Sequence, residues 1–281
     1  MRNASIILLT IAGILQAGCS SASSSGSDER ISILQDGVNR FVYLHIPDGY
    51  SADVSYPLLL VFHGSGDSGA AFQQHSGIDK KADQQGFIVA YPSSRGSNWA
   101  EGCDCTQADI DGVDDVGLVD EIIDIIDDDY SLNRDRVFAA GYSQGAFFTQ
   151  RLACERSSTF KGVASISGMM SSPMASSCQP EVGLDVLLMH GTDDGSVPIT
   201  GFQSGGYQSL SSYETMLFWR EANDCPLGLE RQTYDDTDLS RDVRSIGQCR
   251  DNSQVRMDEI LEGRHQWYDF IPGEIVEFFG L

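Results

Sequence analysis

Short apolar runs alternate with helix-like stretches along most of this chain, and that alternation limits the folds open to it. The runs have the length of strands buried on both faces of a sheet, and amphipathic stretches separate them. Strands that alternate with helices form parallel sheets through right-handed crossovers, so the sequence predicts an α/β fold in a single domain. The expected strands are 41–46, 57–62, 87–91, 137–140, 162–166, 186–189 and 255–261, and the expected helices are 76–85, 115–129, 145–156, 208–222 and 273–279.

The pentapeptide Gly141-Tyr142-Ser143-Gln144-Gly145 follows one expected strand and precedes an expected helix. It fits G-x-S-x-G, and strand, motif and helix together are the setting of a nucleophile elbow, where small residues let the chain turn sharply under an exposed serine. A serine hydroxyl needs a base to take its proton and an acid to orient that base. We therefore expect Ser143 to be a nucleophile in an α/β-hydrolase fold with a mostly parallel central sheet flanked by helices.

The base and the acid should follow the serine in the order acid, then histidine. Two histidines follow it: His190 ends a buried strand, where we expect a structural role, and His265 lies in a polar loop before the last helix. We therefore expect His265 to be the base. The acid should lie in the turn after strand 186–189, where Asp193 and Asp194 are both candidates and spacing does not choose between them.

An oxyanion formed at the serine would need backbone N–H donors. One should be the N–H of Gln144, directly after the nucleophile. The other should be that of Ser65, in a loop whose glycines allow close approach of the backbone, while the neighbouring His63 is expected to be structural.

Beyond these motifs, the chain resembles the polyhydroxybutyrate-depolymerase and feruloyl-esterase-like group of α/β-hydrolases over roughly residues 35–280. One departure is Ala146, where that group usually has a second glycine after the elbow. The resemblance is carried by His63-Gly64 with Gly66, Gly86–Pro92, Trp99, Asp114–Gly117, Arg136-Val137, the elbow, Cys154, Cys178, His190–Asp194 with Val197-Pro198, and His265-x-Trp267.

The resemblance implies that Asp194 is the catalytic acid and His265 the base of a serine esterase working through an acyl-enzyme without a cofactor. It also implies feruloyl or acetyl esters of plant walls, or short hydroxyalkanoate esters, as substrates. Trp99 and Trp267 fall near the expected catalytic loops, so we expect each of them either to contact the substrate or to pack a loop. Two alternatives stay open: a serine peptidase of the same fold, and a non-catalytic surface lipoprotein that keeps the fold as a binding scaffold.

The first residues predict export. Arg2 is followed by an apolar run, Ser5–Leu15, that is too short to span a bilayer, as in a signal peptide. Residues 15–19 resemble a bacterial lipobox, so we expect a lipoprotein-type signal peptide over 1–18, a lipidated Cys19, a Ser/Gly tether over 19–30 and a catalytic domain over 31–281. The predicted location is the cell envelope, as an outer-membrane or surface lipoprotein; ordinary cleavage, for example after Ala22, would give a secreted protein instead.

Six further cysteines form an even set, which in an exported chain indicates three disulfides. Pairing between near neighbours favours Cys154–Cys178 and Cys225–Cys249, each closing a loop that stabilises the fold by roughly 3–4 kcal/mol. Cys103 and Cys105 would then pair with each other. The spacing suits zinc poorly, so no metal is expected there.

Acidic residues dominate the charge, with 41 Asp and Glu against 18 Lys and Arg and a net charge of −23. Such a surface repels phosphate backbones and anionic lipids, which excludes a nucleic-acid partner and leaves the lipid anchor as the expected membrane contact. Residues 101–129 carry no Lys or Arg, and their field should oppose anionic ester substrates if they rim the cleft. Asp109-x-Asp111-Gly112 suggests a calcium loop but lacks the rest of an EF-hand.

Overall fold

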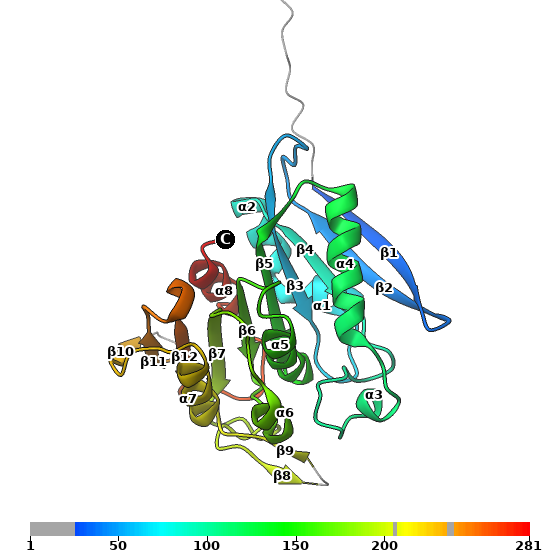
Figure 1. Ribbon diagram of the computed structural model, residues 1–281. Helices are drawn as coiled ribbons and strands as arrows, with labels where there is room; N and C mark the ends of the chain where they lie inside the picture. The colour runs from blue at the N-terminus through cyan, green and yellow to red at the C-terminus, as the bar shows by residue number, and fades with distance from the viewer. Residues whose placement is uncertain (1–25, 205–206, 235–238) are drawn as a thin grey trace, which may run out of the picture.

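A ten-stranded sheet runs through the protein and carries helices on both faces (Figure 1). The computed structural model describes residues 26–204, 207–234 and 239–281. The strand order is β1-β2-β4-β3-β5-β6-β7-β12-β11-β10. The structure thus has the α/β-hydrolase fold that the sequence predicts.

The parallel strands form the centre of the sheet. Their side chains are buried on both faces because helices cover both, which is why their sequences are almost continuously apolar. Antiparallel strands extend the sheet at each edge. The parallel strands are β3 (Tyr56–Phe62), β4 (Ile88–Pro92), β5 (Leu132–Tyr142), β6 (Gly162–Ile166), β7 (Asp185–Gly191) and β12 (Val255–Ile260); β1 (Ser27–Gln35), β2 (Val38–Ile46), β10 (Glu230–Tyr234) and β11 (Arg241–Ile246) are antiparallel to a neighbour.

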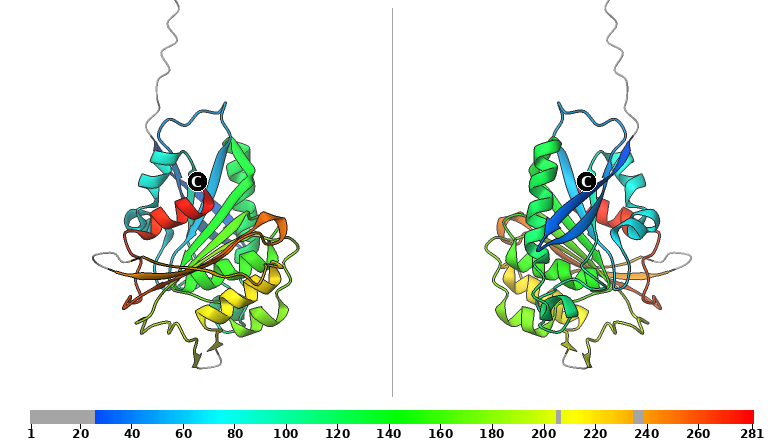
Figure 2. Two further views of the ribbon diagram at one scale, coloured as in Figure 1. Left: turned by 90° about the vertical axis from the view of Figure 1, so that its left-hand side faces the viewer. Right: turned by 90° about the vertical axis from the view of Figure 1, so that its right-hand side faces the viewer.

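Helices lie against both faces of the sheet (Figure 2), and a hydrophobic core fills the space on each side. On one face the apolar side of α4 (Asp115–Asp129) packs beside α5 (Gln144–Glu155) and α7 (Ser212–Ala222). On the other, α1 (Gly69–Ser76), α2 (Ile78–Gln85) and α8 (Ile271–Phe279) cover the sheet. Within the described residues, no helix combines the length and apolarity that crossing a membrane requires.

Smaller elements gather beyond the carboxyl ends of the parallel strands, where sheets of this kind place their sites (Figure 1). They are α3 (Gln107–Ile110), α6 (Ser172–Ser177) and the short hairpin of β8 (Gln203–Ser204) and β9 (Tyr207–Gln208); a 3-10 turn, Arg250–Asn252, precedes β12.

The tether expected over residues 19–30 is wrong in its last part, because Ser27–Arg30 belong to β1 and pair with β2, starting at Ser27 opposite Ile46. Most of this edge strand is exposed and polar, so its sequence shows little apolar alternation, and Ile33 is its one buried side chain. Cys19 and the expected signal peptide lie outside the described residues.

Three disulfides join the same pairs that the sequence favours: Cys154–Cys178, Cys225–Cys249 and Cys103–Cys105. The first ties α5 to the end of α6, and the second ties the end of α7 to the turn before β12. The third closes a small ring in the loop after β4, next to the site described below.

Candidate active site

Ser143 occupies a sharp turn between β5 and α5. Its backbone has φ 54° and ψ −119°, a conformation with positive φ that costs a non-glycine residue on the order of 1–3 kcal/mol. The turn fits only because glycines flank it: a Cβ on Gly141 would lie 2.2 Å from the carbonyl oxygen of Gly145, and one on Gly145 would lie 2.3 Å from that of Phe62. The G-x-S-x-G spacing is therefore a packing requirement here.

The structure brings Ser143, His265 and Asp194 into one chain of hydrogen bonds. His265 Nε2 lies 2.9 Å from Ser143 Oγ, and His265 Nδ1 lies 2.7 Å from Asp194 Oδ2. Since Nδ1 faces a carboxylate, it carries the ring proton, and Nε2 is left to accept from the serine hydroxyl. Asp193 is exposed and its backbone N–H bonds to Gly263, so the geometry distinguishes the two aspartates.

The Asp194 carboxylate is buried among donors. Its Oδ1 accepts from the backbone N–H groups of Ser196 and Val197, at 2.9 and 2.7 Å. Burial alone would raise the pKa of Asp194, but the hydrogen bonds from His190, His265 and Val197 outweigh it and lower the pKa below its usual range. Asp194 is therefore ionised under ordinary conditions and can stabilise a positive charge on His265.

His190 has a closer relation to this site than its strand-end position suggests. Its Nε2 donates to the Val197 carbonyl at 2.7 Å and lies 3.4 Å from Asp194 Oδ2. Sequence reasoning assigned it a structural role and missed this contact. The signal that could have found it is the spacing of four residues between the histidine and the acid across one tight turn.

Backbone N–H groups lie close to the serine on two sides. A Cβ placed on Gly64 would lie 3.3 Å from Ser143 Cβ, so the loop carrying Ser65 lies directly against the nucleophile. Gln144 is the first residue of α5, where the N–H has no partner within the helix. In residues 26–204, 207–234 and 239–281, no hydrogen bond engages the N–H of Ser65 or of Gln144. Both are free to receive an oxyanion.

His63 holds the loop that carries Ser65. Its Nδ1 donates to the Gly64 carbonyl at 2.8 Å, and its Nε2 accepts from the Ser94 N–H at 3.1 Å. Burial lowers the pKa of His63, so the ring is neutral and both bonds can form. The expected structural role of His63 agrees with this geometry.

Of the two roles expected for Trp99, the structure shows packing. Its side chain is fully buried and packs between Phe62 and Phe148, because an indole offers large apolar area to the core below the site. Its Nε1 donates to the His63 carbonyl at 3.0 Å, and its backbone bonds with the side chain of Gln144. Trp99 therefore braces both segments that carry the free N–H groups.

Trp267 is partly exposed and anchors the loop that carries His265. Its Nε1 donates to the Ser76 carbonyl at 2.9 Å, and its ring meets those of Phe72 and Tyr142 edge-on. These contacts hold the loop against α1. The expected contact between Trp267 and a substrate stays a prediction.

A buried carboxyl group, Glu101, lies beside the site and was not singled out from the sequence. It is 1% exposed and accepts from the side chain of Gln144 at 3.0 Å and from the Tyr207 hydroxyl. No motif marks it, because it is one acid in a long acidic segment. Its burial is a tertiary effect of the small hairpin and the loop after β4 meeting at this point.

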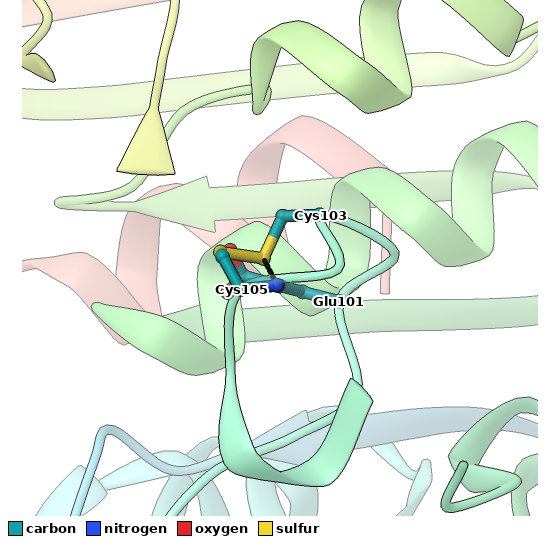
Figure 3. Close-up of side chains that lie close together, drawn as sticks. All are labelled: Glu101, Cys103 and Cys105. Carbon is teal, nitrogen blue, oxygen red and sulfur yellow. Dashed lines mark hydrogen bonds between the residues drawn. A yellow bond between two sulfur atoms is a disulfide. The ribbon is translucent and has the colours of Figure 1, made fainter. Parts of the chain in front are cut away.

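Two clusters of the described residues each bring three side chains of metal-ligating types together. In the first, Glu101, Cys103 and Cys105, the sulfur atoms are bonded to each other and offer no thiolate (Figure 3). In the second, Asp28, His45 and Asp79, the His45 nitrogens face Asp28 and Asp83, and these acids raise the pKa of His45 although burial opposes them. The raised pKa favours the protonated ring, which offers no lone pair to a metal.

The suggested calcium loop is explained by local structure. Thr106 caps α3 by accepting from the Asp109 N–H, and one Asp109 carboxylate oxygen accepts in return from Thr106. The other oxygen accepts from the Gly102 N–H. Asp111 accepts from the side chain of Gln107. The spacing that suggested calcium arises from a capping box and a helical side-chain pair.

Fold and site together define an α/β-hydrolase with a Ser–His–Asp arrangement at the carboxyl end of its sheet. The family model for Esterase PHB depolymerase matches residues 41–198, more than half of the chain, and the chain belongs to that family. His265 lies beyond the matched segment, so its place beside Ser143 is a finding of the structure.

Relatives in sequence and in fold carry esterase names. NocK of Nocardia uniformis subsp. tsuyamanensis, named as an esterase, is 32% identical over 169 residues, which are 60% of this chain and 49% of NocK. Feruloyl esterase C of Emericella nidulans is 29% identical over 178 residues, 60% of this chain and 61% of that protein. The chain thus spans about half to two thirds of the length of these relatives. The acetyl xylan esterase from Aspergillus awamori superimposes with a TM-score of 0.65 at 15% identity, covering 90% of this chain and 99% of that one.

Proposed function

We propose that this protein is a carboxylic-ester hydrolase that uses Ser143 as its nucleophile. The observation that carries the proposal is the unbroken hydrogen-bond chain from Asp194 through His265 to Ser143, with two free backbone N–H groups beside the serine. Esterase family membership and esterase relatives support the same chemistry.

The geometry suits an acyl-enzyme mechanism. His265 Nε2 takes the hydroxyl proton as Ser143 Oγ attacks the ester carbonyl, and ionised Asp194 stabilises the imidazolium that forms. The N–H groups of Ser65 and Gln144 donate to the oxyanion of the tetrahedral intermediate. His265 then gives its proton to the leaving alcohol, and water hydrolyses the acyl-enzyme by the same steps in reverse. Besides the ester and water, these steps use groups of this chain.

For substrates, we propose soluble feruloyl or acetyl esters. Support comes from the names of the relatives, among them feruloyl esterase C and an acetyl xylan esterase. The acidic segment adds a charge preference. Five of its acids, among them Asp104, Asp111 and Asp114, lie in the connection between β4 and α4, while the others lie on α4. Methyl hydroxycinnamates should be cleaved faster than esters with a free carboxylate, and salt should narrow the gap because it screens exposed charge.

Labelling with a fluorophosphonate tests the function directly. We expect one equivalent to add to Ser143, and Ser143→Ala to prevent labelling and lower ester turnover by about 10³-fold or more. Ser165→Ala is the matched control, since this buried serine lies on the neighbouring strand β6 and bonds only to backbone carbonyls. A wild-type protein that neither labels nor turns over esters would mean that the fold serves as a binding scaffold. An active Ser143→Ala variant would mean that Ser143 is not the nucleophile.

We further propose that the protein is exported and anchored by lipid at Cys19. The three disulfides support an oxidising compartment. Mass spectrometry of the mature, non-reduced protein should find a lipidated N-terminal Cys19 and no free thiol. A mature chain that begins at Ser23 would instead indicate ordinary signal-peptide cleavage and a secreted enzyme.

A further inference from the structure

The side chain of Gln144 uses all of its hydrogen-bonding groups to hold the loop after β4. Its Oε1 accepts from the Trp99 N–H at 2.7 Å, and its Nε2 donates to the Trp99 carbonyl at 2.8 Å and to Glu101 Oε2 at 3.0 Å. The same residue carries a backbone N–H proposed to bind the oxyanion. The hydrogen bonds of its side chain therefore help to fix the direction of that N–H.

Glu101 is the third partner of the Gln144 side chain, although burying an acid at this position costs free energy. Its Oε2 accepts from Gln144, and its Oε1 forms a hydrogen bond with the Tyr207 hydroxyl, which donates to the ionised acid and can accept from the protonated one. Among the described residues, the groups that act on its ionisation are these two neutral donors and Asp109, with no cation. Burying a carboxyl group without a cation stabilises nothing by itself. The arrangement indicates a role in the site.

The two segments that meet at Glu101, the loop after β4 and the β8–β9 hairpin, are each held in place by further contacts. The disulfide Cys103–Cys105 closes the loop two residues further on (Figure 3). The Gly102 N–H bonds to Asp109, and the Ala100 carbonyl accepts from Arg151. On the other side, the ring of Tyr207 stacks on Phe202 and meets Phe147 edge-on. The carboxyl group thus connects two constrained segments to one side chain.

We propose that Glu101 is a positioning residue of the oxyanion hole, holding the Gln144 N–H in its direction through the Gln144 side chain with Tyr207 as its support. The proposal rests on the proposed function, because it assumes that an oxyanion forms at Ser143. The proposal predicts an effect on kcat with little effect on KM. Loosening Gln144 should weaken binding of the transition state, which carries the oxyanion, and leave binding of the neutral ester nearly unchanged.

Three variants of this contact separate positioning from general structure. Glu101→Ala removes both acceptors and should lower kcat about 10-fold or more with KM within about threefold of wild type. Glu101→Gln keeps a carbonyl for Gln144 and an amide that can donate to the Tyr207 oxygen, so it should stay within about threefold of wild-type kcat. Tyr207→Phe should lower kcat about threefold to fivefold.

Two controls match these changes far from the site. Asp185→Ala removes a partly buried carboxylate that accepts from the Gln254 N–H at the amino end of β7, and Tyr56→Phe removes a buried hydroxyl at the start of β3. Both should destabilise the fold while leaving kcat within about twofold of wild type.

The measurement is kcat and KM for one soluble aryl ester on folded protein, with fluorophosphonate labelling of each variant. An active wild type whose Glu101→Ala variant keeps kcat, or loses only KM, would overturn the proposal, as would a Glu101→Gln variant as impaired as Glu101→Ala. If Glu101→Ala does not fold, an unchanged kcat in Tyr207→Phe overturns it instead. A wild type that neither labels nor turns over esters would be the separate failure of the proposed function.

Discussion

Two buried carboxyl groups flank the nucleophile, one in the turn after β7 and one in the loop after β4, and their surroundings drive them to opposite charge states. Asp194 accepts from two backbone N–H groups and faces two imidazoles, which lower its pKa in spite of burial. Glu101 has two neutral donors, and burial raises its pKa to about 8. One is an anion at neutral pH and the other is mostly protonated.

The difference shows that the hydrogen-bond donors around a buried acid decide whether it is ionised or protonated. An ion survives in a low-dielectric site when hydrogen bonds replace its water shell, and it takes up a proton when they do not. The site needs both outcomes: a fixed negative charge behind His265, and no negative charge beside the place where the oxyanion forms. Three experiments test this contrast, in order of decreasing expected effect.

The largest effect should come from removing the charge of Asp194. Asp194→Asn keeps the shape but no longer matches the Nδ1 proton of His265, so kcat should fall by about 10³- to 10⁴-fold. Steady-state ester kinetics measure this. Asp193→Asn is the matched control and should stay within about twofold of wild type, because Asp193 is exposed and its carboxylate makes no contact with His265. Equal losses at the two aspartates would contradict the assignment of the acid.

An effect of intermediate size should appear in the pH dependence of stability. With its pKa raised from 4.5 to about 8, folded Glu101 holds a proton that the unfolded chain releases across this range. Stability contributed by the neutral group is therefore lost as pH rises through this range, whereas Glu101→Gln does not titrate. Between about pH 5 and pH 9, the wild type should lose on the order of 3 kcal/mol relative to Glu101→Gln in urea unfolding.

Asp194 supplies the internal contrast for that measurement. Its pKa is lowered on folding, so the stability it contributes is present above its ordinary pKa of 3.8 and lost as the pH falls below it. The wild type should therefore lose stability relative to Asp194→Asn on acidification, the opposite sign to Glu101→Gln. The same sign for both variants would show that the two carboxyl groups do not differ as described.

The smallest effect should come from His190. His190→Phe keeps a ring of similar size but removes the N–H that faces Asp194 and Val197, and kcat should fall about 10-fold because a bond to a charged group is lost. His45→Phe is the control, an imidazole among carboxylates at the end of β2, away from the serine. An unchanged kcat in His190→Phe would leave His190 the purely structural role that its sequence position suggests.

The parts of the fold predicted from sequence are those with strong periodicity. α4 is found at the predicted 115–129, and β6 at the predicted 162–166, because their apolar patterns extend over the whole element. The strands β1 and β10 were missed for the opposite reason. Every residue of β10 is exposed and β1 buries only Ile33, so pairing at the sheet edge, rather than burial, makes them strands.

The site divides in the same way. Ser143 and His265 stand out because a strained turn and a polar loop leave clear sequence patterns, and the structure brings them together. The role of Trp99 stayed open because proximity in sequence to a site loop does not tell whether an indole points to substrate or to core. Glu101 and Tyr207 meet across 106 positions, and no local pattern reports a contact between residues so far apart.

The entry of the chain into the sheet has a practical consequence. β1 runs antiparallel to β2, which runs antiparallel to β4, so the first residues of β1 lie at the amino ends of the parallel strands, opposite the serine (Figure 1). An acyl chain, an affinity tag or a solid support attached ahead of Ser27 would join the domain at the end of the sheet opposite Ser143. The protein can be immobilised by its amino terminus with the reactive pole turned toward solution.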